Sequence, residues 1–271
     1  MARASTTERQ RSTPRAARLA AVAAVVALLA VVVARVWPST HPTVVPVCQA
    51  RGAAGTFALT ADQAANATTI AAVGKRLGLP DHAVSVALAA ALQESGLHNL
   101  PGGDRDSVGL FQQRPSQGWG TPQQISDPTY AATAFYDHLA QVPGWASRSV
   151  TDAAQAVQHS AAPNAYASWE SEARTLAAAF TGEVAGAFSC RFSPPSGQPL
   201  RTEMAAAMSR QLGTPTVAAT VDARRGWLVA SWVVGHALQY RVGAVSFAGH
   251  RWTPAAGAWV ARPPDVPRVE V

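Results

Sequence analysis

A single glutamate, Glu94, lies where an apolar helical run gives way to polar, glycine-rich chain. Residues 84–92 are apolar almost all round, as in a helix that is buried within a domain. Ser95 and Gly96 are expected to end this helix, which would leave the carboxyl group of Glu94 among aliphatic neighbours and near the negative end of the helix dipole. Both effects favour the protonated carboxyl group. The pattern therefore predicts a general acid that donates a proton to a leaving oxygen.

The residues after Glu94 supply further polar groups, on a segment too rich in glycine and aspartate to be helical throughout. A second carboxylate could come from Asp104, with Asp106 as a weaker candidate. Each aspartate could equally bond local backbone amides in a turn. Ser95 and Gln112 could orient the carboxyl group or bind a substrate, or they could only end the helix and close the loop.

Three short patches follow one another along the chain: Glu94-Ser95, Gly109-Leu110-Phe111-Gln112 and Pro163-Asn164-Ala165-Tyr166-Ala167. Taken in order, they make the chain resemble the lysozyme-like superfamily of lytic transglycosylases and goose-type lysozymes. The second patch is similar to the family's G-L-[FM]-Q signature, and the third is similar to its P-x-A-Y segment. Gly103-Asp104-Arg105 is also similar to a G-D-R tripeptide of the goose-type branch. The resemblance covers about residues 60–180.

The resemblance implies cleavage of the β-1,4 bond between N-acetylmuramic acid and N-acetylglucosamine in peptidoglycan, with Glu94 as general acid and base. In the lytic transglycosylase route the muramoyl C6 hydroxyl attacks and gives a 1,6-anhydro product. In a hydrolytic route Asp104 would assist a water, and inverting hydrolases hold the two carboxyl groups about 6.5–9.5 Å apart. Goose-type lysozymes carry another aspartate two positions after the signature glutamine, where this chain has Arg114. That departure favours the transglycosylase route.

Aromatic and amide side chains near the three patches are candidates for binding the glycan strands of peptidoglycan. Trp119 and Tyr166 could form flat platforms for sugar rings, although core packing is the commoner fate of aromatic residues. Gln113 and Arg114 would line the cleft. The alternative function is a catalytically silent protein that binds peptidoglycan or acts as a scaffold in the cell envelope.

Motifs for several other chemistries do not occur in the sequence. It contains no G-x-S-x-G, H-E-x-x-H, C-x-x-C or Walker-type loop, which argues against acyl transfer, zinc hydrolysis and nucleotide binding. The seven histidines are scattered and show no metal-ligand spacing. We therefore expect neither a metal nor a cofactor.

The amino terminus predicts a membrane anchor. Five arginines precede an uncharged stretch at residues 19–34, and Arg35 and Trp37 follow it. A helix of that length spans about 24 Å, and interfacial side chains extend it toward the roughly 30 Å of a bilayer core. We expect a cytoplasmic tail at 1–16, an uncleaved transmembrane signal-anchor helix at 17–37, and the catalytic domain outside the cell membrane. A cleaved signal peptide is the alternative.

The rest of the chain is almost neutral. Six of the 22 lysines and arginines lie in residues 1–35 together with one acid, Glu8, which leaves 16 basic and 15 acidic residues elsewhere. A net charge of +1 over that part provides no basic stripe, so nucleic acid is not an expected partner.

Two cysteines, Cys48 and Cys190, bracket the candidate domain and are the only ones in the chain. Outside the cytoplasm, an even pair in this position predicts a disulfide that ties the ends of the domain together. Two buried free thiols are the alternative.

Helix start and stop signals between the cysteines predict a mainly α, lysozyme-like domain at residues 48–190, after a linker at 38–47. Thr60 to Gln63 reads as a capping box that opens one helix, and Asp127 precedes a proline as the cap of another. No long alternating strand is expected between the cysteines.

Beyond the second cysteine, the composition of residues 191–199 predicts a Pro/Ser linker. Residues 200–271 are expected to form a small, separate α+β module with a cell-envelope protein as a candidate partner. Its expected elements are helices at 201–212 and 227–240, a strand at 216–221, and a hairpin of 242–247 with 250–252.

Overall fold

The computed structural model describes residues 45–160, 164–214, 222–262 and 269–271. The expected tail and signal-anchor helix at residues 1–37 lie outside these ranges. Within them, no helix is both long enough and apolar enough to cross a bilayer.

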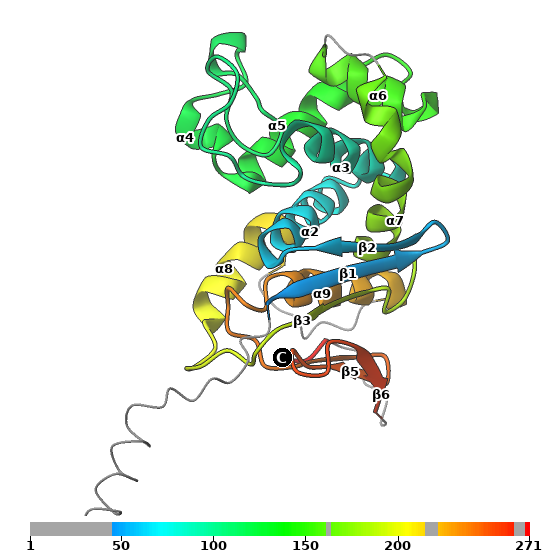
Figure 1. Cartoon of the computed structure of the whole chain (residues 1–271), viewed down its shortest axis with the longest axis vertical. Helices are drawn as coiled ribbons and strands as arrows, with labels where there is room; N and C mark the ends of the chain where they lie inside the picture. The colour runs from blue at the N-terminus through cyan, green and yellow to red at the C-terminus, as the bar shows by residue number, and fades with distance from the viewer. Residues whose placement is uncertain (1–44, 161–163, 215–221, 263–268) are drawn as a thin grey trace, which may run out of the picture. The chain divides into compact units, whose positions relative to one another are not determined.

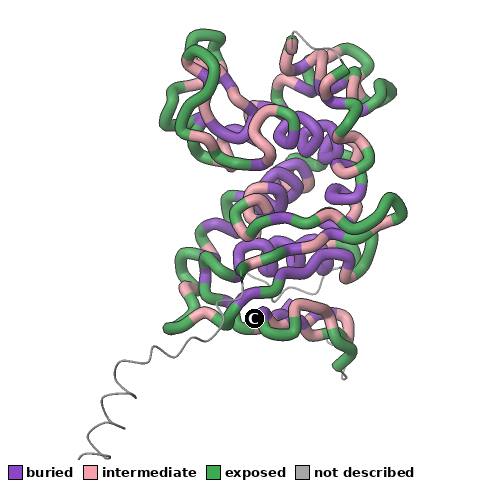
Figure 2. Tube along the Cα trace, viewed as in Figure 1, coloured by how far each residue is buried: buried purple, intermediate pink, exposed green. Residues whose placement is uncertain are grey.

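Helices α2 (Ala61–Arg76) and α3 (Asp81–Ser95) lie at the centre of the fold (Figure 1). The predicted capping box is present, because Thr60 accepts from the backbone N–H of Gln63 and the Gln63 side chain accepts from that of Thr60. Helix α3 is buried without interruption over residues 83–92, as its apolar sequence predicts, and it ends at Gly96 in the left-handed conformation (Figure 2).

Three of the remaining helices of the central part pack on α3. Helices α5, α6 and α7 contact α3, and α5 also packs on α2. Asp127 caps α5 by accepting from the backbone N–H groups of Thr129 and Tyr130, as its place before a proline predicts. The helices are α4 (Pro122–Ile125), α5 (Pro128–Gln141), α6 (Val150–Gln158) and α7 (Glu170–Phe180), with short 3-10 turns η1 (Pro115–Gln117), η2 (Trp145–Ser147) and η3 (Ala165–Trp169).

An antiparallel sheet joins the two ends of this helical part. Strands β1 (Val47–Gly52), β2 (Gly55–Leu59) and β3 (Phe188–Arg191) pair in the order β2-β1-β3. Cys48 lies opposite Cys190 in the β1–β3 pair, and the two form a disulfide, which confirms the predicted bond.

The prediction of a mainly α fold is therefore wrong. The described chain contains two three-stranded antiparallel sheets beside its helices, so its fold is mixed. Strands β1 and β3 escape prediction because they are short and because their pairing joins segments separated by 142 positions, a relationship that local periodicity does not carry.

The carboxy-terminal segment contains helices α8 (Arg201–Leu212) and α9 (Ala223–Gly235) and strands β4 (Val245–Phe247), β5 (His250–Trp252) and β6 (Trp259–Ala261). Helix α8 has the predicted bounds, and β4 and β5 form the predicted hairpin. The strand expected at 216–221 lies outside the described residues.

The expectation of a separate carboxy-terminal module needs correction too. The described residues form one compact unit, in which α8 packs on α2 while α9 contacts α2, α7 and β3. Helix α9 is buried on all sides over residues 226–235, and a segment of this size does not enclose such a helix alone. The approach of α9 to α2 is close, because a Cβ atom on Gly235 would lie 2.6 Å from Oγ1 of Thr68.

Candidate active site

Glu94 occupies the last turn of α3, half-buried, and a buried tyrosine holds its carboxyl group. The hydroxyl of Tyr166, in η3, donates a hydrogen bond of 2.6 Å to Oε1 of Glu94. Burial and the adjacent carboxyl group raise the pKa of Tyr166 far above its usual range, so its hydroxyl remains a donor. Among the described residues, no hydrogen bond occupies Oε2 of Glu94, which leaves that oxygen for a substrate.

The signature segment is tied to the same end of α3. The hydroxyl of Ser95 lies 2.7 Å from the carbonyl oxygen of Leu110, and the amide of Gln158, at the end of α6, donates to the carbonyl of Phe111 at 2.9 Å. Phe111 itself is fully buried and stacks on Phe135 of α5, with ring centroids 4.7 Å apart. Residues from each of the three patches therefore meet at the carboxy-terminal end of α3.

The side chain of Gln112 closes the loop formed by the residues that precede it in the sequence. Its Oε1 accepts from the hydroxyl of Ser107 at 2.9 Å, and its Nε2 donates to the carbonyl of Gly109 at 3.1 Å. Gly103 packs so closely that a Cβ atom there would lie 1.7 Å from Oε1 of Gln112, which explains a glycine at that position. Gln113 lies in the interior, 2% exposed, and donates to the carbonyl of Ala131 on α5 at 3.1 Å, so it does not present itself to a cleft.

The two candidate second carboxylates both lie on this loop. The side chain of Asp104 is 93% exposed, and its ion pair is a long one, 3.8 Å to Arg105. Asp106 accepts from Nε of Arg114 at 2.8 Å and from the backbone N–H of Ser116, and these bonds hold the pKa of its carboxyl group far below its usual range. In the part of the chain that is described, neither aspartate forms a hydrogen bond with Glu94.

The two aromatic residues that are candidate sugar platforms differ in their burial. Tyr166 is fully buried, so its ring cannot stack on a sugar, and its hydroxyl serves Glu94 instead. Trp119 is half-buried and stacks on the imidazole of His138, with ring centroids 3.8 Å apart. Sequence reasoning missed Trp169, whose indole N–H donates to Oε1 of Gln93 at 2.8 Å, beside Glu94. Its position three residues after Tyr166, one turn on, is the signal that could have found it.

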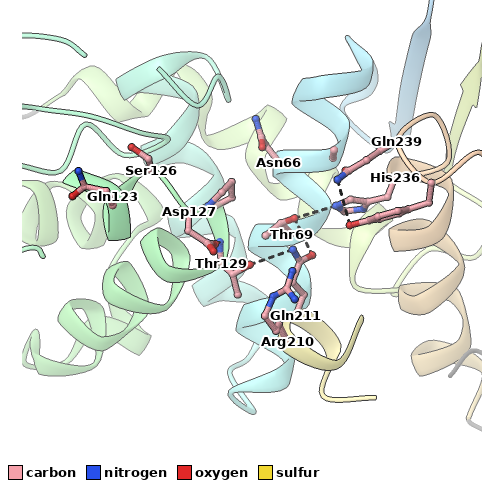
Figure 3. A pocket seen from close by; sticks show the side chains of 13 residues that line it. Asn66, Thr69, Gln123, Ser126, Asp127, Thr129, Arg210, Gln211, His236 and Gln239 are labelled. Atoms are coloured by element: carbon pink, nitrogen blue, oxygen red, sulfur yellow. Dashed lines mark hydrogen bonds between the residues drawn. The ribbon is translucent and has the colours of Figure 1, made fainter. Parts of the chain in front are cut away.

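A polar cavity of about 440 Å³ lies between α2, α5, α8 and α9 and does not include Glu94 (Figure 3). The buried amide of Gln211 spans its wall, because Oε1 accepts from Thr69 at 3.0 Å and from the indole of Trp232 at 2.6 Å while Nε2 donates to Thr129 at 3.2 Å. These bonds join α8 and α9 to α2 and α5. The described side chains contain no group of three His, Cys, Asp or Glu residues placed to hold a metal ion.

No protein-family model matches the chain, and no curated protein matches it in sequence.

Proposed function

We propose that this chain cleaves the β-1,4 bond between N-acetylmuramic acid and N-acetylglucosamine in peptidoglycan, as a lytic transglycosylase with Glu94 as general acid and base. The supporting observation is the hydrogen bond from Tyr166 to Glu94, which joins two of the three lysozyme-like patches across 72 sequence positions. The third patch adjoins them through Ser95 and Leu110.

The proposed reaction uses one carboxyl group twice. Oε2 of Glu94 gives its proton to the glycosidic oxygen as the bond from that oxygen to muramoyl C1 breaks and positive charge develops at C1. The resulting carboxylate then accepts the proton of the muramoyl C6 hydroxyl, whose oxygen bonds to C1 and closes the 1,6-anhydro ring. Glu94 ends protonated, ready for another cycle.

Tyr166 is a positioning residue in this scheme. Its hydroxyl donates to Oε1 throughout, which fixes the orientation of the carboxyl group and stabilises the carboxylate formed in the first step. Since the pKa of Tyr166 is raised by burial, the tyrosine does not compete as the proton donor.

The surroundings of the two aspartates favour the transglycosylase over a hydrolase. An inverting hydrolase needs a second carboxylate that activates a water. Asp104 extends into solvent, and Asp106 is engaged by Arg114 and Ser116. Attack by a hydroxyl of the substrate itself needs only Glu94.

The disulfide supports a location outside the cytoplasm. Such bonds form and persist in oxidising compartments, which include the wall side of a bacterial cell membrane, where peptidoglycan lies. We place the candidate site there, with glycan strands as its partner.

Digestion of purified peptidoglycan by the full chain tests the proposal, with products identified by mass spectrometry. Products that carry 1,6-anhydro ends are expected, and Glu94→Gln should reduce their rate of release by at least about 100-fold, because it removes the proton donor while keeping the shape. Glu203→Gln, at an exposed position in α8, is the matched control. Retention of the unsubstituted chain on peptidoglycan without products would support a silent wall-binding protein, and reducing ends would support hydrolysis.

A further inference from the structure

A cavity of about 360 Å³ lies between the second half of α5, the turn that follows it and the end of α6. Three nitrogen-bearing side chains, His138, Arg148 and His159, lie on its wall beside the amide of Gln141. No aspartate or glutamate is among the lining residues, although Asp137 and Asp152 belong to the same two helices. The wall therefore offers hydrogen-bond donors and positive charge to a ligand.

The bonds of these side chains leave donors available. Nε of Arg148 donates to the carbonyl of Pro143 at 3.2 Å, which anchors the guanidinium group, and no ion pair in the described ranges engages its terminal nitrogens. Nδ1 of His138 lies 2.8 Å from the carbonyl oxygen of Ala134. Because a carbonyl only accepts, Nδ1 carries a hydrogen, so Nε2 of the neutral ring is an acceptor and becomes a donor only when the ring is protonated. His159 is exposed where α6 ends, in the left-handed conformation.

The cavity adjoins the candidate active site along two segments. His159 follows Gln158, which holds the carbonyl of Phe111, and precedes Ser160, which hydrogen-bonds the hydroxyl of Tyr166. At the α5 wall of the cavity, the ring of His138 stacks on Trp119, which follows the signature segment 109–112 in the sequence. His159, on the wall of this cavity, is therefore next in the chain to a serine that is linked to Glu94 through the hydroxyl of Tyr166.

We propose that the cavity binds an oxyanion carried by the wall polymer, namely a carboxylate of the peptide stem next to the glycosidic bond that Glu94 cuts. This inference rests on the proposed function. A guanidinium group binds a carboxylate through two parallel hydrogen bonds, and the amide N–H of Gln141 and a protonated imidazole can donate to it as well. The cavity would thereby select muramoyl residues that bear an acidic peptide over bare glycan. A phosphate of another wall polymer has the same chemistry, so the test separates the two.

Binding is measured on the full chain that carries Glu94→Gln. This variant lacks the proposed proton donor, so the measurement does not depend on cleavage. The probes are a soluble muramoyl peptide with free carboxylates, the same peptide with its carboxylates amidated, and inorganic phosphate. Calorimetry gives the affinities, and the imidazole C–H signals of His138 and His159 report the location. We expect the acidic peptide to shift both signals and the amidated peptide to bind about tenfold more weakly or worse, the usual loss for a hydrogen bond to a charged group.

Substitution of the arginine provides the second arm. Arg148→Gln should lower the affinity for the acidic peptide by about tenfold. Arg148→Lys should recover part of that affinity because it restores the positive charge. Arg51→Gln, at an exposed position in β1, is the matched control and should change nothing.

Equal affinity for both peptides, or full affinity in Arg148→Gln, would overturn the inference. Saturable binding of phosphate, together with no binding of the acidic peptide, would also overturn the peptide assignment. That result would point to a phosphate-bearing polymer. The result is separable from the proposed cleavage: peptide binding can fail while the unsubstituted chain still releases anhydro products, and cleavage can fail while the histidine signals still respond.

Discussion

The hydroxyl of Tyr166 lies 2.6 Å from Oε1 of Glu94, so two residues 72 positions apart form one acid site. Helix α3 brings the glutamate and η3 brings the tyrosine, and the two elements pack directly on each other. The buried phenol holds one carboxyl oxygen, and the other is left for the substrate.

Tyr166→Phe should lower kcat by about 10- to 100-fold and leave KM nearly unchanged. Phenylalanine fills the same buried space, so the change is the loss of one hydrogen bond to a charged group, about 1.5–3 kcal/mol. Steady-state kinetics on soluble glycan fragments measure the effect. Tyr130→Phe, which removes a hydroxyl bonded to the carbonyl of Trp119, is the control. An unchanged kcat in Tyr166→Phe would refute the positioning role.

Asp104→Asn should retain activity within about twofold, because the exposed side chain is not hydrogen-bonded to Glu94 in the described structure. The same digestion assay, with product masses, measures it. A loss comparable to that of Glu94→Gln, together with products that have reducing ends, would mean that Asp104 serves as the second carboxylate of a hydrolase.

Removal of the disulfide should destabilise the whole fold. The bond closes a loop of 142 positions and joins β1 to β3 across the first sheet, so Cys48→Ala with Cys190→Ala should lower the free energy of unfolding by about 2–5 kcal/mol. Urea unfolding provides the measurement. A reductant should destabilise the unsubstituted chain similarly and leave the double variant unaffected; a double variant as stable as the parent would contradict the expected contribution.

Acid should weaken the contact between α9 and α2 through His236. Burial lowers the pKa of this imidazole to about 4, below its ordinary value of 6.5. As the pH falls below 6.5 the unfolded chain takes up a proton that the folded chain refuses, so the stabilisation is present above 6.5 and is lost between 6.5 and 4.

In urea unfolding, the free energy of unfolding of the parent chain should therefore fall by about 2–3 kcal/mol between pH 7 and pH 4.5. The variant His236→Gln should lack this decrease. His250→Gln, at an exposed histidine of β5, should retain the full loss. Identical pH dependences of the parent and His236→Gln would show that His236 does not contribute.

The sequence predicted best those features that are local. The capping box at Thr60, the glycine end of α3 and the bounds of α8 follow from neighbouring residues and are confirmed. The disulfide was predicted from the cellular compartment and the count of cysteines, without knowledge that a sheet places Cys48 opposite Cys190.

Features that depend on distant contacts were missed. Helix α9 reads as part of a small module until its burial against α2 and β3 is known. For Tyr166 the sequence leaves a sugar platform and core packing open; the ring is buried, and nothing in its neighbourhood shows that its hydroxyl reaches Glu94. The sequence leaves Asp106 as a weaker second carboxylate or a turn residue and places Arg114 in the cleft, whereas an ion pair joins the two across the loop.

The mass of the products released from peptidoglycan tests the central claim most directly. We expect the full chain to release muropeptides lighter by one water than hydrolytic products, and Glu94→Gln to release them at least about 100-fold more slowly while remaining folded. Anhydro products that persist undiminished in Glu94→Gln, or the absence of any product from the folded parent chain, would contradict it.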